Sequence, residues 1–188
     1  MKTDASLKAS PSMSVAYEVA DNREVGLGGA AAREREDAFR DVVERYRDMV
    51  FRIAYTYMRD PADADDVTQD VFVKLLRQGK AFESDEHLRF WLVRVTVNEC
   101  KSLFRKPWRR TEDIEAYAGT LSMPSDGHAA LFSSVMRLPE KLRIPLVLFY
   151  YGGFSTSEIA AMLHVSGAAV RKRLSRARSK LKVELEVE

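Results

Sequence analysis

A cluster of cationic side chains near the C-terminus is the strongest chemical signal in the sequence. A solvated helix face normally mixes charges of both signs. Between Ile159 and Val183, however, there is no carboxylate. Unpaired arginines suit DNA, because an arginine in the major groove can donate two parallel hydrogen bonds to guanine. The stretch therefore predicts a DNA-binding helix, the alternative being a basic helix that is only solvated. Its cations are Arg171, Lys172, Arg173, Arg176, Arg178, Lys180 and Lys182.

Two helices joined by a short turn are predicted to position these cations. Ser155 and Glu158 have the spacing of a reciprocal cap at the start of the first helix, on which Ile159 and Leu163 share one face. Ser166 is a candidate cap for the second helix. A stripe of apolar residues would then hold the second helix against the first: Val170, Leu174, Ala177 and Leu181.

Two further charged stretches lie well before this region. Five Asp and no base lie between Asp60 and Asp70, whereas five bases and no acid lie between Lys101 and Arg110. Because the net charge is only +2, it is the separation of the patches that predicts separate partners. Helical spacing places Asp63, Asp66 and Asp70 on one outward face with Gln69 and Phe72 beside them, and aligns Arg94, Asn98 and Lys101 on another.

The apolar periodicity predicts an all-α protein of two small domains. A three-helix N-terminal bundle is expected over residues 33–106, with helices over 33–59, from the Asp60-Pro61 cap to about 78, and over 85–106. A helix-turn-helix domain is expected over 129–188, where Pro145 should kink or delay one helix. A flexible N-terminal tail (1–32) and a flexible linker (107–128) complete the organisation.

The composition argues against several other classes of protein. One cysteine, Cys100, and no Cys/His cluster with zinc spacing predict a reducing cytosolic compartment, no metal and no cofactor. No apolar run has the length of a membrane span. An enzyme that holds Mg²⁺ on the Asp cluster is a weaker alternative, since the chain lacks a glycine loop for phosphate and a paired general base.

Five segments together resemble the extracytoplasmic-function (ECF) group of bacterial sigma factors in the sigma-70 family. They are Asp63–Phe72 (DADDVTQDVF), Phe90–Asn98 (FWLVRVTVN), Leu138–Lys141 (LPEK), Glu158–Ala160 (EIA) and Val170–Arg178 (VRKRLSRAR). The likeness covers residues 36–106 and 129–182. It implies that the N-terminal bundle corresponds to region 2, which binds core RNA polymerase and the −10 promoter element. The C-terminal domain would correspond to region 4, which binds the −35 element. His164 stands where this family often has Gly in the turn.

The resemblance also assigns candidate binding residues. It implies a core polymerase interface at Asp66, Gln69, Asp70 and Phe72. It implies contacts with the melted −10 strand at Arg94, Asn98 and Lys101. The −35 reader would use Ser166, Gly167, Ala168, Arg171, Lys172, Arg173, Arg176 and Arg178. Of these, Arg176 and Arg178 are expected to contact phosphates.

The expected function is therefore promoter choice and not catalysis. The chain should direct core polymerase to promoters by recognising −10 and −35 DNA, act in the bacterial cytoplasm at the nucleoid, and be held inactive by an anti-sigma factor. The alternative is a stand-alone helix-turn-helix transcriptional regulator that binds symmetric half-sites without polymerase.

Overall fold

The computed structural model describes residues 29–78, 82–104 and 127–185, and all of their regular structure is helical. The elements are α2 (Gly29–Met58), α3 (Pro61–Arg77), α4 (Asp85–Phe104), α5 (Gly127–Arg137), α6 (Glu140–Tyr150), α7 (Thr156–Leu163) and α8 (Gly167–Leu185). The all-α prediction is confirmed. The predicted tail and linker fall largely outside the described residues, although α2 begins at Gly29, within the predicted tail.

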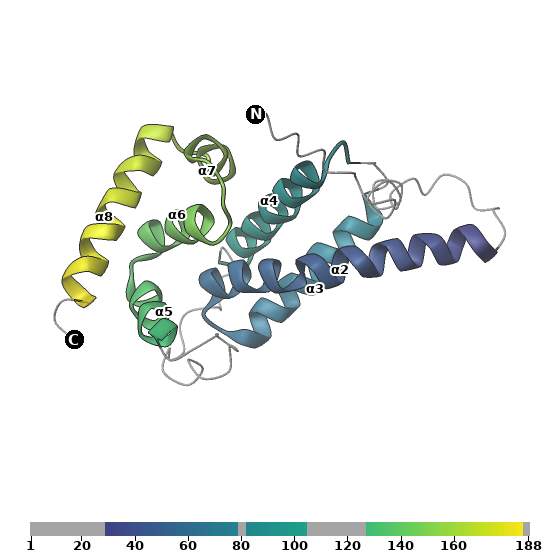
Figure 1. Cartoon of the computed structure of the whole chain (residues 1–188), viewed down its shortest axis with the longest axis horizontal. Helices are drawn as coiled ribbons and strands as arrows, with labels where there is room; N and C mark the ends of the chain where they lie inside the picture. The colour runs from purple at the N-terminus through teal and green to yellow at the C-terminus, as the bar shows by residue number, and fades with distance from the viewer. Residues whose placement is uncertain (1–28, 79–81, 105–126, 186–188) are drawn as a thin grey trace, which may run out of the picture.

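The N-terminal bundle consists of α2, α3 and α4 packed side by side (Figure 1). Val50, Val67 and Leu92, one from each helix, are fully buried and form its centre. The start of α3 follows the predicted cap, because the Asp60 carboxylate accepts a hydrogen bond of 2.8 Å from the backbone N–H of Asp63. The bundle therefore presents the outer faces of α3 and α4 on a rigid core.

The C-terminal domain places α8 against both α6 and α7. Pro145 does not delay the helix as predicted, because α6 begins at Glu140 and continues through this proline, whose missing N–H removes one backbone hydrogen bond. Gly153 has φ +66° after α6, and a Cβ on Gly152 would lie 2.6 Å from the Leu148 carbonyl oxygen. These two glycines let the chain turn tightly from α6 towards α7.

The two halves of the molecule pack against each other (Figure 1). Helix α2 contacts α6, and α4 contacts α7. Aromatic side chains meet across the boundary: Tyr55 stacks on Phe132 with ring centroids 6.2 Å apart, and Phe90 lies edge-to-face with Phe154 at 6.4 Å. A continuous apolar core therefore joins the bundle to the helix-turn-helix domain.

Candidate nucleic-acid interface

The start of α7 has the reciprocal cap that the spacing predicted. The Ser155 hydroxyl accepts from the Glu158 N–H at 3.3 Å, and the Glu158 carboxylate accepts from the Ser155 N–H at 2.8 Å. The Ser155 hydroxyl also donates to the Glu158 carboxylate at 2.6 Å, and this hydrogen bond, followed by the one from the Ser155 N–H, lowers the pKa of the Glu158 carboxyl group. Two backbone donors that the helix leaves free are satisfied in this way.

Substituting Ala for Ser155 is expected to lower the free energy of unfolding by about 1 kcal/mol, the usual value of a helix N-cap. The substitution removes the side-chain acceptor and leaves the Glu158 N–H without its partner. Chemical denaturation followed by circular dichroism would measure the change. Ser175→Ala, at an exposed position within α8, is the matched control and should not destabilise the protein. Equal stability of the two variants would contradict the capping role.

The turn between α7 and α8 explains how His164 replaces the expected glycine. His164 adopts the left-handed conformation, with φ 56° and ψ 48°, and its N–H donates to the Ala160 carbonyl. Histidine is among the residues that tolerate this conformation better than branched ones. The Ser166 hydroxyl then accepts from the Ala169 N–H at 3.1 Å and caps α8, as the spacing predicted.

Helix α8 divides into a buried stripe and a cationic face. The stripe is the predicted one: Val170, Leu174, Ala177 and Leu181 are all buried. On α7, Ile159 is buried as expected, but Met162 and not Leu163 is the second fully buried residue; residues three apart share a helix face as well as residues four apart. This packing turns the other side of α8 outwards.

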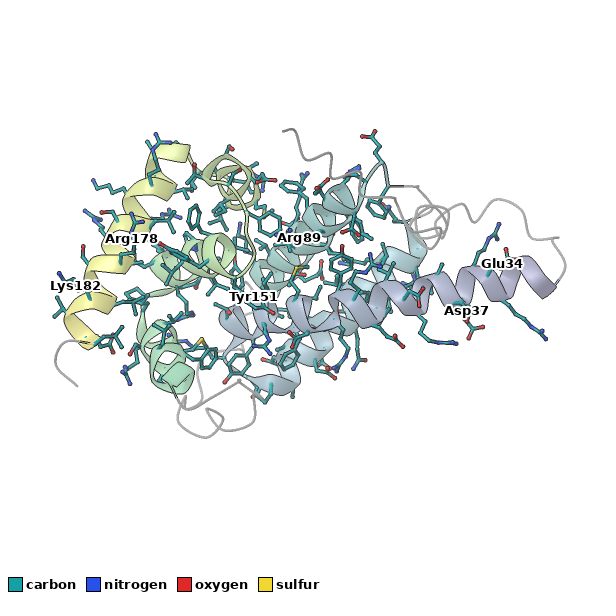
Figure 2. The ribbon with its side chains drawn as sticks, viewed as in Figure 1. Glu34, Asp37, Arg89, Tyr151, Arg178 and Lys182 are labelled. Carbon is teal, nitrogen blue, oxygen red and sulfur yellow. The ribbon has the colours of Figure 1, made fainter. Side chains whose placement is uncertain are left out.

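The outward side of α8 carries the predicted DNA-reading residues. Ser166, Ala168, Arg171, Lys172, Arg176 and Arg178 are exposed, whereas Gly167 and Arg173 are half-buried. Among the described residues, none of the cations from Arg171 to Lys180 forms an ion pair with a carboxylate. Figure 2 shows α8 at one end of the molecule, with Arg178 and Lys182 along it. The structure thus leaves a cationic helix face available to a polyanion.

The second cationic face, on α4, is only partly free. Arg94 and Asn98 are exposed, as the spacing predicted. Lys101 is half-buried, and its ammonium group lies 3.4 Å from the Met162 carbonyl oxygen at the end of α7. In this arrangement one of the three predicted strand contacts is therefore engaged by the C-terminal domain.

The acidic face of α3 differs from the prediction in one residue. Asp66, Gln69 and Asp70 are exposed, and the Gln69 amide donates to Asp65 at 3.1 Å. Phe72, however, is only 6% exposed and lies in the core, so the prediction of an exposed aromatic beside the acids is wrong. The reason is that α3 packs against both α2 and α4 and therefore buries two adjacent positions.

This face also exposes two apolar residues that the acidic pattern did not predict. Val73 and Leu76 follow the acids on α3 and are 39% and 50% exposed. Asp70, Val73 and Leu76 are spaced three residues apart, and residues three apart on a helix lie on the same face. This spacing could have revealed the shared face. The face therefore combines carboxylates with apolar contact area, a combination suited to a cationic amphipathic surface of a partner protein.

Three features of the described residues bear on metal binding, membrane insertion and thiol chemistry. Within these residues no three His, Cys, Asp or Glu side chains are grouped so that they could hold a metal ion. None of the helices in the described ranges has both the length and the apolar character needed to cross a membrane. The Cys100 thiol is buried, which raises its pKa and makes it a poor nucleophile.

A capped helix-turn-helix with an exposed cationic face defines a DNA-binding class of protein, and comparison with known families makes the class specific. The Sigma-70 region 2 family model matches residues 42–110, and the Sigma-70 region 4 model matches residues 128–181. The chain belongs to the sigma-70 family of transcription initiation factors, in its extracytoplasmic-function group. The order of the two regions agrees with the two helical domains of the structure.

Individual relatives agree with this assignment. The ECF RNA polymerase sigma factor SigW of Bacillus subtilis is 26% identical over 168 residues, which cover 80% of this chain and 90% of SigW. The structure of CnrH in complex with the cytosolic domain of CnrY is similar with a TM-score of 0.63 and 29% identity, covering 93% and 96% of the two chains. The sigma factor RpoE of Bartonella quintana, solved with the anti-sigma factor NepR, has the same fold, with a TM-score of 0.66 and 23% identity over 80% of this chain and 98% of that one.

Proposed function

We propose that this chain binds core RNA polymerase and directs it to promoters that carry −10 and −35 elements. The observation that carries the proposal is the exposed cationic face of α8 on a capped helix-turn-helix, in the same chain as a bundle with an exposed acidic face. Catalysis would belong to the polymerase. Such a protein works in the bacterial cytoplasm, at the nucleoid.

Each face has a distinct role in this proposal. The start of α8 enters the major groove of −35 duplex, where Arg171 and Arg173 contact bases and Arg176 and Arg178 contact phosphates. On α4, Arg94, Asn98 and Lys101 hold the melted −10 strand. On α3, Asp66, Gln69 and Asp70 bind the polymerase, with Val73 and Leu76 supplying apolar contact in the place first assigned to Phe72.

Binding of core polymerase should make up for modest DNA affinity in each domain. When one contact tethers the chain, the second becomes intramolecular and gains an effective concentration. The isolated chain is therefore expected to bind promoter DNA weakly, and the assembled holoenzyme tightly.

An anti-sigma factor is proposed as a further partner. In both solved structures described above the similar chain is bound to a second protein, and in the RpoE structure that second protein is named as an anti-sigma factor. This supports a protein inhibitor for the present chain without identifying it.

Copurification followed by transcription tests the proposed function. Tagged full-length chain is mixed with core RNA polymerase, and the complex is then given a library of promoter fragments. Retention of core enzyme and selective transcripts are expected. Tight binding to symmetric half-sites in the absence of polymerase, with no retention of core enzyme, would instead favour the stand-alone regulator.

A further inference from the structure

A buried arginine lies where the two domains meet. Arg143, on α6, is 2% exposed. Its guanidinium donates to the Thr56 carbonyl of α2 at 2.9 Å, and to the carbonyls of Met136 and Leu138 at 3.1 and 2.8 Å. Arg59, just after α2, donates to the Met136 carbonyl from the other domain at 2.6 Å. Two arginines therefore cross-connect the bundle and the C-terminal domain.

These acceptors are the carbonyls that helices leave unpaired. The last four carbonyls of an α-helix have no intrahelical partner and form the negative end of its dipole. Thr56 lies in the last turn of α2 and Met136 in the last turn of α5, and Leu138 is the residue directly after the end of α5. Arg143 thus caps two helices of different domains at once. Among the described residues no carboxylate forms an ion pair with it, so the helix ends are what hold its charge.

Two further sets of contacts close the same boundary. Arg89 of α4 donates to the Gly152 carbonyl and lies 4.7 Å from the centre of the Phe154 ring. The Tyr151 hydroxyl donates to Asp48 of α2 at 3.1 Å. Figure 2 shows Arg89 and Tyr151 between the two halves of the molecule. Polar contacts at three places therefore specify one arrangement of the domains, which apolar packing alone would not do.

This arrangement cannot serve both promoter elements. Elements at −35 and −10 are about 25 base pairs apart, or about 85 Å of duplex at ~3.4 Å per base pair. In the structure Lys101 contacts Met162, and only Leu163, His164 and Val165 separate Met162 from the cap of α8. Four residues span at most ~14 Å, so the two DNA-reading faces are held several times too close together.

We propose that the structure is a self-inhibited, closed form of the free chain, and that Arg143 is the latch that holds it. Opening releases Lys101 from Met162 and lets the two DNA-reading helices move apart. Residues 105–126, which join α4 to α5, could span up to ~75 Å if extended, and about 15 Å of α4 separates Arg94 from the end of that helix. Together these lengths reach the ~85 Å between the two elements, so the covalent chain permits the separation. The inference rests on the proposed function for the assignment of the two DNA-binding faces.

Distance measurements on the full chain test the latch. Nitroxide labels are attached through Ser102→Cys on α4 and Ser175→Cys on α8, both exposed positions, while Cys100 is buried. Pulsed electron–electron double resonance should show one short distance in the parent, the chain that carries only these two labels. Arg143→Met, which keeps the bulk and removes the donors, should add a population at longer distances while circular dichroism shows the helices intact.

A second variant and a control keep the test decisive. Arg89→Met removes the hydrogen bond to the Gly152 carbonyl and the contact with the Phe154 ring without altering the centre of either domain, and should also lengthen the distances. Arg40→Met is the control, because Arg40 pairs only with Glu36 and Asp37 on its own helix, and it should leave the distances unchanged. A long distance in the parent, or unchanged distances in a folded Arg143→Met chain, overturns the proposal. If Arg143→Met does not fold, unchanged distances in Arg89→Met overturn it.

The same samples separate this inference from the proposed function. A chain that opens on Arg143→Met but does not retain core polymerase would refute the function and leave the latch standing. A chain that retains core polymerase, with unchanged distances in both folded variants, would refute the latch alone.

Discussion

Substituting Lys for Asp70 is expected to weaken binding of the chain to core RNA polymerase by at least tenfold while leaving its thermal stability unchanged. Asp70 is exposed on α3, between Asp66 and the apolar residues Val73 and Leu76. A lysine there would oppose a cationic partner surface, and juxtaposed like charges at an interface cost several kcal/mol. A tenfold loss needs only about 1.4 kcal/mol, so the expected effect is comfortably measurable.

A fluorescence titration of labelled chain with core enzyme would measure this loss. Glu44→Lys is the matched control, since Glu44 is also exposed but lies on α2, and it should bind as the parent does. Thermal unfolding of all three proteins checks that folding is intact. Equal affinities of the Asp70 and Glu44 variants would remove α3 from the polymerase interface.

Local signals made much of the fold predictable. The helix starts at Asp60, Ser155 and Ser166 follow from side chains that accept hydrogen bonds from a backbone N–H three residues later. The stripe on α8 follows from helical periodicity, because a helix that packs on one side buries one residue in every three or four. These features depend on neighbours within about one or two turns, and such neighbours are visible in a sequence.

Features that depend on distant parts of the chain were not predictable in this way. Phe72 is buried because α3 has two packing partners, and the periodicity of α3 alone does not reveal the second. Arg143 has the sequence appearance of an exposed helix charge. Its burial depends on two helix ends that converge on it from 87 and 7 residues away in sequence. The relative placement of the domains rests on such contacts, and therefore became apparent only in three dimensions.

The second large effect is expected at Arg171 on α8. Arg171→Ala should lower transcription from the promoters that the parent chain selects by about 5-fold to 150-fold, because losing a bidentate arginine contact with guanine costs about 1–3 kcal/mol. Arg171 is exposed beside the capped first turn of α8, the part of a recognition helix that meets base edges. Transcription with core enzyme, on promoters randomised through the −35 element, would measure both the loss and the change in base preference.

Arg176→Ala provides the matched comparison, because Arg176 is also exposed but lies further along α8. A phosphate contact there carries no sequence information, so its loss should weaken all promoters alike and reduce the slope of log affinity against log salt by about one. Arg171→Ala should instead relax the choice at one base pair. If both variants reduced transcription uniformly across the randomised promoters, α8 would hold DNA by charge alone, and base reading would have to be assigned to another part of the chain.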